Sequence, residues 1–297
     1  MTLMHVILKL GDMSWYLRPA GGRDRILVGT YLLLLSGLFF VLSGPISAQS
    51  KSGAAELGSQ TARNGFRNED EIAAKFNSWR TDEAAKIWLA FMSSRLAEIE
   101  SVAAVKPHGE KADIQVRVRT KAGEKVEGIS IKLVSSTNGF NQIDKRWVAQ
   151  YVKMWKMPAD VEAALRLFVG ETKPGKSGRT AGRIYINEFD AGTQKKIVEF
   201  FEAKKDEVVS DMLRGEGPFS AGWMLVALKS DAKPRWVLRS IDHVIKYYSD
   251  GPVVITRNGN LKIGRITMQR KGGDGGRETA KMLQFKINPA LLFSGKQ

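Results

Sequence analysis

Two segments near the middle of the chain alternate apolar and polar residues, and this alternation limits the folds that the chain can adopt. The segments are residues 113–120 and 127–135, and a polar stretch containing Gly123 joins them. Such alternation is typical of strands that bury one face, and the short polar connection predicts a β-hairpin. Helical periodicity on both sides of the hairpin then predicts a mixed α/β fold, in which helices flank the sheet.

The rest of the chain shows further periodic segments but no internal repeat and no long low-complexity linker. We expect two helices within residues 68–102, broken near Arg80, and helices at 142–155, 158–169, 191–213 and 241–248. We expect strands at 223–228, at 235–239 and within 253–270, and a loop rich in Gly, Lys and Arg at 173–183. One α/β domain is the simplest organisation that accommodates these segments.

The composition favours a polyanionic partner and excludes cysteine chemistry. The formal net charge is +15, from 46 basic and 31 acidic side chains, so nucleic acid is the leading partner and an anionic membrane surface the alternative. The chain has no cysteine and three histidines, which excludes disulfides and thiol nucleophiles and leaves a zinc site almost without ligands. A metal ion would therefore be a hard cation held by oxygen atoms.

An uncharged run of 25 residues, 26–50, follows three arginines near the N-terminus. Its length suits a membrane span, and the small residues near Ser47 also suit a secretory signal with a cleavage site. The other interpretation is that Met1 lies upstream of the true start of translation. We therefore treat residues 1–53 as a hydrophobic appendage and residues 54–297 as the domain that carries the function.

The hairpin places three polar side chains where they can meet. Ser130 and Lys132 share the polar face of the second segment, because strand residues two apart point the same way. Asp113 lies on the polar side of the first segment, and antiparallel pairing can bring it close to both. Metal-dependent phosphodiester cleavage needs a carboxylate to hold Mg²⁺ and a lysine to orient or deprotonate the attacking water. Taken alone, the pattern also suits an ordinary solvated strand face.

Longer stretches carry a resemblance to a known family. They are ELGSQTARNGFRNE at 56–69, IKLVSSTNGFNQIDKRW at 131–147, DMLRGEG at 211–217, RWVLR at 235–239 and GRITMQRKGGDGGRETAKMLQFKINP at 264–289. Through them, residues 54–293 resemble type II restriction endonucleases of the HinP1I family, which cut the palindrome GCGC, and more distantly MspI. The resemblance implies the PD-(D/E)XK nuclease fold, a mixed β-sheet flanked by helices, with Asp113 and Lys132 as the catalytic aspartate and lysine.

Ser130 departs from the pattern of that superfamily, in which most members have a second carboxylate here and the close relative has a glutamine. A neutral hydroxyl removes one negative charge from the metal site, so we expect Ser130 to be a weaker ligand that acts through water. Glu69, on the first predicted helix, can add a carboxylate to the site. Its alternative role is to stabilise the N-terminal end of that helix.

The C-terminal segment is the predicted DNA-reading surface. Residues 257–297 hold nine basic and two acidic side chains among several glycines, which let a backbone approach phosphates closely. Arginine and lysine donate to guanine and aspartate accepts from cytosine, so the segment supplies groups that a GC-only site requires. The candidates are Arg265, Gln269, Arg270, Lys271, Asp274 and Arg277. The alternative is a basic loop that only neutralises phosphates.

A second group of DNA-binding candidates follows the hairpin directly and consists of Phe140, Asn141 and Gln142. Without the resemblance, Phe140 would be a loop side chain that packs into the core. The resemblance implies instead a role in the minor groove, where Phe140 wedges into the base stack and Gln142, beside Asn141, probes base edges.

Together these observations predict a cytoplasmic, Mg²⁺-dependent endonuclease that cuts both strands of double-stranded DNA at GCGC or a close relative of it. Self-protection would need a companion cytosine methyltransferase. Two alternatives stay open: an exported or membrane-tethered nuclease, if residues 26–50 are translated, and a catalytically inactive DNA-binding protein, in view of Ser130. A homodimer and a monomer acting on each strand in turn both suit a four-base palindrome.

Overall fold

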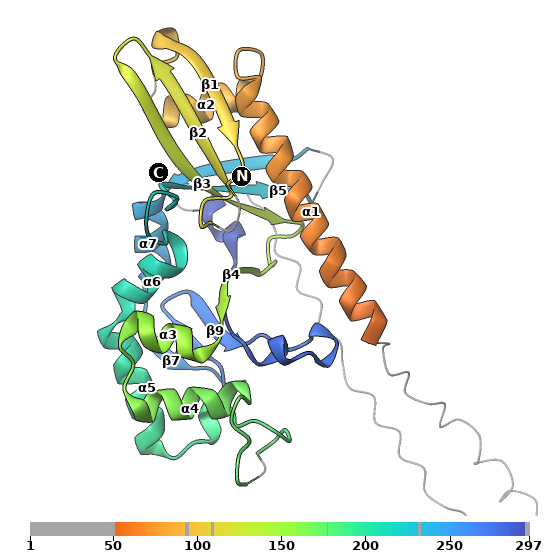
Figure 1. The fold of residues 1–297 in the computed structure, drawn as a ribbon, viewed down its shortest axis with the longest axis vertical. Helices are drawn as coiled ribbons and strands as arrows, with labels where there is room; N and C mark the ends of the chain where they lie inside the picture. The colour runs from red at the N-terminus through yellow and green to blue at the C-terminus, as the bar shows by residue number, and fades with distance from the viewer. Residues whose placement is uncertain (1–50, 93–94, 108–109, 177, 231–232, 295–297) are drawn as a thin grey trace, which may run out of the picture. The chain divides into compact units, whose positions relative to one another are not determined.

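The structure is a computed structural model, in which residues 49–297 group as one compact unit. It describes residues 51–92, 95–107, 110–176, 178–230 and 233–294, all of them in this unit (Figure 1). The uncharged run at 26–50, and with it the predicted signal or membrane span, lies outside these residues. Within the described ranges, no helix is both long and apolar enough to cross a bilayer.

The first sheet is mixed and, in the described part of the chain, has the strand order β1-β2-β3-β5-β6. Its strands are β1 (Ile99–Val105), β2 (Ile114–Thr120), β3 (Gly123–Val134), β5 (Trp223–Leu228) and β6 (Arg235–Ser240). β3 and β5 run parallel, whereas the other neighbouring pairs are antiparallel. The sheet and the helices beside it confirm the predicted α/β fold class (Figure 1).

The predicted hairpin forms from β2 and β3, and its register pairs Ile114 with Ile129. Ile114, Val116 and Ile129 are fully buried, because the alternating pattern turns one face of each strand to the core. Gly123 begins β3 with φ of 138°, a conformation that side chains disfavour. The local sequence therefore sets both the pairing of the two strands and the face that they bury.

A second sheet, antiparallel throughout, has the order β4-β10-β9-β8-β7 among the described residues. Its strands are β4 (Asn141–Arg146), β7 (Val253–Ile255), β8 (Leu261–Ile263), β9 (Ile266–Arg270) and β10 (Leu283–Ile287). The expectation of a helix over the whole of residues 142–155 is wrong, because residues 141–146 pair with β10. A partner that lies far along the chain outweighs the local helical periodicity here.

The helices are α1 (Lys51–Asn77), α2 (Glu83–Phe91), α3 (Val148–Trp155), α4 (Ala159–Val169), α5 (Ala191–Ala203), α6 (Lys205–Leu213) and α7 (Ile241–Ser249). Short 3-10 turns are η1 (Leu96–Glu98), η2 (Ile186–Glu188), η3 (Asp274–Gly276), η4 (Glu278–Lys281) and η5 (Pro289–Phe293). The break expected near Arg80 is present, and α2 begins where the Asp82 carboxylate accepts a hydrogen bond from Ala85 N at 3.0 Å.

Two further helix predictions need correction. The second predicted helix does not extend to residue 102, because residues 99–105 form β1 and pair with β2. The single helix expected at 191–213 is two helices, α5 and α6, which separate at Lys204. In both places a tertiary neighbour decides the outcome: a strand partner in the first, and packing of both helices into one core in the second.

Two hydrophobic cores meet beside β3. One core packs Ile72 and Phe76 of α1 and residues of α2 against the first sheet, including Ile129 and Ile131 of β3. The other joins the remaining helices to the second sheet and includes Val134 at the end of β3. The chain therefore crosses from one core to the other within β3, between Ile131 and Val134, where the predicted catalytic residue Lys132 lies.

Candidate active site

Asp113 is the centre of the predicted catalytic group. It directly precedes β2, and its backbone N donates to Ile129 O at 2.9 Å. One carboxylate oxygen, Oδ2, accepts hydrogen bonds from Ile131 N at 2.5 Å, Ser130 Oγ at 3.2 Å and Lys132 Nζ at 3.4 Å. The hairpin register thus brings together the three side chains that the sequence selected.

Ser130 and Lys132 differ in their exposure. Ser130 is 1% exposed, and its hydroxyl donates to the Asp113 carboxylate. Lys132 is half-buried and also donates from Nζ to Ile131 O at 3.0 Å. The backbone N–H and C=O of Ile131 therefore both point toward the Asp113 side of β3. The carbonyl of Ile131 adds an oxygen to the group of Asp113, Ser130 and Lys132.

Glu69 lines the same pocket as Asp113 from inside α1, and its alternative role at the N-terminal end of that helix is wrong, because α1 begins at Lys51. Burial raises the pKa of Glu69, and the charge of Asp113 raises it further, whereas a hydrogen bond from Lys106 opposes the change. Lys106 Nζ lies 3.0 Å from Glu69 Oε2. Since Asp113 and Glu69 repel each other across the site, a cation between them would relieve the repulsion.

A pocket of about 270 Å³ opens between α1, the end of β3 and the start of β4. Its lining includes Asp113, Lys132 and Glu69, but Ser130 is not among the residues that line it. Asn68, next to Glu69, also lines the pocket and is 2% exposed. Its side-chain oxygen and nitrogen have no hydrogen-bond partner among the described residues, so a bound group or water can take that place.

Lys111 is a further charged residue beside the site. Burial lowers the pKa of Lys111 to about 8, against the attraction of Asp144. Its Nζ donates to Ile143 O at 2.9 Å. Sequence reasoning selected neither Lys111 nor Asn68, although Lys111 lies two residues before Asp113 and Asn68 lies in one of the resemblance stretches.

Residues 92–293, well over half of the chain, match the family of the R.HinP1I restriction endonuclease. The chain belongs to this family. It is therefore a type II site-specific endonuclease that acts on DNA, and the predicted resemblance is confirmed. The match begins after α1, so Asn68 and Glu69 precede the matched residues.

The fold agrees with that of another restriction enzyme. A crystal structure of the restriction endonuclease MspI in complex with its cognate DNA superimposes with a TM-score of 0.56 and 14% sequence identity. The superposition covers 78% of this chain and 92% of that chain. The comparison with curated proteins gives no match. The R.HinP1I family member described here thus shares the PD-(D/E)XK fold with MspI.

The residues predicted to enter the minor groove lie at the rim of the pocket. Phe140 is 58% exposed, which excludes the alternative of a core side chain. Asn141 and Gln142 begin β4 and line the pocket together with Lys132. The exposed ring and the two amides thus follow the candidate catalytic strand on the same side of the domain.

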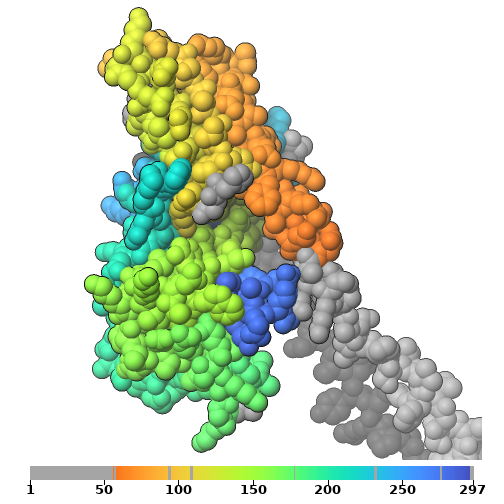
Figure 2. All heavy atoms as spheres, in the orientation of Figure 1, coloured from red at the N-terminus to blue at the C-terminus, as the bar shows by residue number. Residues whose placement is uncertain are grey.

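Five of the six C-terminal candidates lie at one end of the second sheet. Gln269 and Arg270 end β9, and the Asp274 carboxylate in the loop that follows accepts from Lys271 Nζ at 2.6 Å and pairs with Arg277 at 3.4 Å. Figure 2 shows this loop, in blue, at the surface beside α1, in orange, with which η3 packs.

Arg265, the sixth candidate, lies apart from the others at the opposite end of β9. Its guanidinium pairs with Asp250 at 2.5 Å and lies 4.1 Å from the ring of Tyr247. Both partners belong to α7 or directly follow it. The structure therefore does not bring Arg265 together with the other candidates.

A row of three glutamines connects the two groups of DNA-binding candidates across the second sheet. Gln269 on β9 donates to Gln284 on β10 at 3.3 Å, and Gln284 donates to Gln142 on β4 at 2.5 Å. Gln284 was not selected from the sequence, because its place between the other two depends on strand pairing. The row ends at the pocket of Asp113 and Lys132.

Proposed function

We propose that this member of the R.HinP1I family is a Mg²⁺-dependent endonuclease that hydrolyses both strands of DNA at GCGC or a closely related GC-only palindrome. The observation that carries the proposal is the convergence of Ser130 Oγ, Ile131 N and Lys132 Nζ on one oxygen of Asp113, in a pocket also lined by Glu69. This group combines the carboxylates and the amine that metal-assisted phosphodiester hydrolysis uses.

The side chains present fit a hard cation. The candidate donors are oxygens: the carboxylates of Asp113 and Glu69, the carbonyl of Ile131 and the unpartnered amide oxygen of Asn68. Oxygen donors favour Mg²⁺ over softer metals, and Mg²⁺ keeps several waters, so a site with few carboxylates suits it. The proposed site has only two carboxylates, and in the described part of the chain no three Asp, Glu or His side chains come together as a metal-binding group. When bound, Mg²⁺ would supply electrostatic stabilisation of the charge that develops on the scissile phosphate.

The protein's own groups have distinct tasks in this proposal. Lys132 Nζ orients the attacking water and takes part in the proton transfer, because it is the amine that opens into the pocket. Asp113 holds this amine in place. The Ser130 hydroxyl does not line the pocket; it donates to Asp113 and so acts on the cation through that carboxylate, where the usual carboxylate would be a ligand itself.

For DNA recognition, we propose that Phe140 wedges into the minor groove, with Asn141 and Gln142 at the base edges. Its exposed ring at the rim of the pocket supports this assignment. The major-groove readers are the other five C-terminal candidates besides Arg265, of which Lys271, Asp274 and Arg277 are paired with one another and must exchange partners to reach bases. For Arg265 the displaced position favours a phosphate contact over a base contact.

The wider setting follows from the activity. A GC-only cutter needs a companion cytosine methyltransferase to protect its own DNA, and a cytoplasmic location is where it meets incoming DNA. Residues 54–297 form the nuclease domain of this proposal, and a homodimer would cut both strands of the palindrome in one event.

The test is to incubate the purified protein with unmethylated plasmid and Mg²⁺ and to sequence the fragment ends. Ends at a single GC-only palindrome support the proposal, and ends at random positions contradict the specificity. The same reaction on plasmid methylated at the cytosines of GCGC should give no fragments. Full-rate cleavage of the methylated plasmid would contradict the methyltransferase partner.

A catalytically inactive DNA-binding protein is the second candidate function, and the neutral Ser130 favours it. The two candidates separate in one comparison, between the wild-type protein and Ser130→Gln, which restores the amide of the close relative. Cleavage by the wild type rejects the inactive protein. Site-specific binding without cleavage by the wild type, together with cleavage by Ser130→Gln, would establish it.

A further inference from the structure

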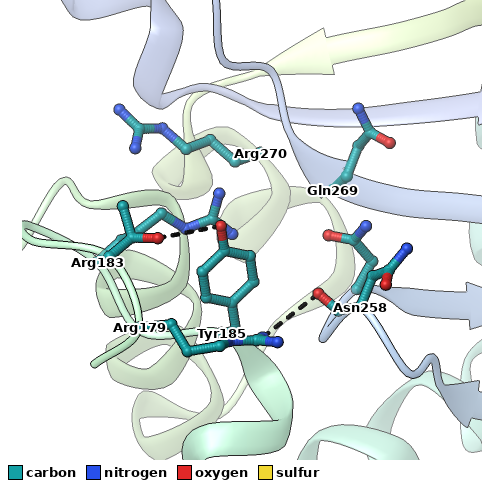
Figure 3. A pocket seen from close by; sticks show the side chains of 8 residues that line it. Arg179, Arg183, Tyr185, Asn258, Gln269 and Arg270 are labelled. Atoms are coloured by element: carbon teal, nitrogen blue, oxygen red, sulfur yellow. Dashed lines mark hydrogen bonds between the residues drawn. The ribbon is translucent and has the colours of Figure 1, made fainter. Parts of the chain in front are cut away.

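A second hollow, of about 480 Å³, opens on the second sheet and shares no lining residue with the pocket of Asp113 and Lys132 (Figure 3). Its lining residues come from the loop before η2, from the β7–β8 connection and from β9. They are Arg179, Thr180, Arg183, Tyr185, Asn258, Asn260, Gln269 and Arg270. From the sequence, residues 173–183 are expected only to form a loop rich in Gly, Lys and Arg. The site arises from the packing of that loop against the second sheet.

Arg183 is the feature of this hollow that requires a ligand. It is 8% exposed, and its Nε and Nη2 are buried with no hydrogen-bond partner among the described residues. The guanidinium lies 4.1 Å from the ring of Tyr185 and 4.8 Å from that of Phe168. Aromatic contacts of this kind fix the plane of a guanidinium but satisfy none of its N–H groups. A buried cation with unmet donors is costly unless an anion completes the site.

The residues around Arg183 also favour an anion. Arg179 lies 4.1 Å from the same tyrosine ring, and Arg270 contributes a third guanidinium. No carboxylate is among the residues that line the hollow. The Glu188 carboxylate accepts from the backbone N of Arg179 and Tyr185, both at 2.7 Å, and pairs with the Arg179 guanidinium at 3.4 Å, so it holds the loop in place and offsets part of the charge of Arg179. Planar guanidinium donors from several directions match the oxygens of a phosphate.

The position of the hollow connects it to DNA. Gln269 lines the hollow and is one end of the glutamine row whose other end, Gln142, lines the candidate active-site pocket. The row crosses three strands, so its ends are two strand spacings apart, about 10 Å. A DNA groove is about 6 to 12 Å wide, which is the same scale. DNA held at the active-site pocket therefore has a backbone within reach of the hollow.

We propose that Arg179 and Arg183, beside the base-reading candidate Arg270, form a binding site for one backbone phosphate of the DNA substrate, distinct from the phosphate that is cut. The inference rests on the proposed function only in taking DNA as the ligand. A base is the poorer occupant, because the ring of Tyr185 already carries two guanidiniums and is not free to stack. The contact fixes the position of the duplex on the second sheet without reading its sequence.

The test measures the salt dependence of DNA binding. In a Lys132→Ala background, fluorescence anisotropy follows two labelled duplexes, one with GCGC and one without it, over a range of salt concentrations. Arg179→Gln and Arg183→Gln should each weaken binding of both duplexes several-fold at low salt and lower the slope of log K against log salt by about 1. The preference for GCGC should not change.

The matched control is Arg119→Gln, which removes an equal charge from an exposed arginine on β2 that pairs only loosely with Glu124, at 4.0 Å. It should leave the slope unchanged. Arg183→Lys, which keeps the charge, should restore most of the slope if Arg183→Gln lowers it. Melting temperatures show whether Arg183→Gln still folds, and the half-exposed Arg179 carries the test if it does not.

Three results would overturn the proposal. An unchanged slope in both arginine variants means that the hollow contacts no DNA phosphate. A loss confined to the GCGC duplex means that it reads bases. Stabilisation of the wild type by inorganic phosphate, absent in Arg183→Gln and combined with an unchanged DNA slope, assigns the hollow to free phosphate.

The outcome is separable from that of the proposed function. If plasmid fragments end at random while the slope falls as expected, the GC-only specificity is wrong and the phosphate site stands. If fragments end at GCGC and the slope stays unchanged, the GC-only specificity stands and the phosphate site is wrong. If neither the wild type nor the Lys132→Ala protein binds either duplex, both proposals are wrong.

Discussion

Replacing Lys132 by alanine separates the chemistry of the site from its folding. Nζ lies 3.4 Å from Asp113 Oδ2 and 3.0 Å from Ile131 O. After truncation, Asp113 keeps its hydrogen bonds from Ile131 N and Ser130 Oγ, and Ile131 O, which loses the bond from Nζ, lies in a residue that lines the pocket and can accept from water there. The ion pair is partly solvated, with the lysine side chain 15% and the aspartate side chain 24% exposed. We therefore expect the free energy of unfolding to change by no more than about 1 kcal/mol.

The effect on the rate should be much larger. A positioned group that transfers a proton contributes about 10²- to 10⁴-fold, which corresponds to about 3 to 5 kcal/mol of activation free energy at roughly 1.4 kcal/mol per tenfold. Single-turnover cleavage of a GCGC duplex measures the rate, anisotropy measures binding, and a melting curve measures stability. Lys132→Ala should bind DNA and melt like the wild type but cut at least about 100-fold more slowly.

The matched control lies on the same strand. Lys125→Ala removes an exposed lysine of β3 that pairs with Glu127 at 2.5 Å, outside the pocket, and it should cut at the wild-type rate. The reasoning is refuted if folded, DNA-binding Lys132→Ala cuts within a few-fold of the wild type. Equal losses in both lysine variants would also refute it, since the effect would then be one of net charge.

Three further predictions address the metal, the wedge and the C-terminal loop. A chelator should stop cleavage and added Mg²⁺ should restore it; cleavage that continues in excess chelator contradicts the metal site. Phe140→Ala should weaken specific binding and reduce DNA bending, because the ring offsets an unstacking cost of a few kcal/mol per step; an unchanged bend in a fluorescence-transfer assay rejects the wedge. Hydrogen bonds from Lys271 and Thr279 lower the pKa of Asp274 to about 2, so its contribution to loop stability is complete above pH 3.8 and is lost as the pH falls toward 2. Asp274→Asn should therefore speed amide exchange across residues 271–279 at neutral pH, and exchange equal to that of the wild type would show that these bonds do not hold the loop.

The central part of the candidate site could be predicted because its parts are close in sequence. A period of two, with Ile114 and Val116 on one strand and Ile129 and Ile131 on the other, sets which faces are buried. Once the strands pair, their register places Asp113 and Lys132 close to each other. The same locality explains why the ends of predicted helices were less accurate: residues 99–105 and 141–146 follow strand partners that no local pattern shows.

Residues of the site that come from distant segments could not be assembled in this way. Asn68 and Glu69 reach the pocket because α1 packs across the first sheet through Ile72 and Phe76, and that docking depends on the whole core. Gln284 joins Gln269 to Gln142 only after β10 has paired with strands on both sides.

By itself the sequence determined the hairpin, the group of Asp113, Ser130 and Lys132, the absence of cysteine chemistry and the need for an anionic partner. These follow from residue type, charge and short-range periodicity, which act before the chain is folded. Only the tertiary structure decided that there are two sheets in the described residues, that Arg265 lies apart from the other basic candidates, and that Nε and Nη2 of Arg183 are buried with no hydrogen-bond partner in that part of the chain. Burial and long-range pairing are properties of the packed chain, because each depends on residues that are neighbours in space and not in sequence.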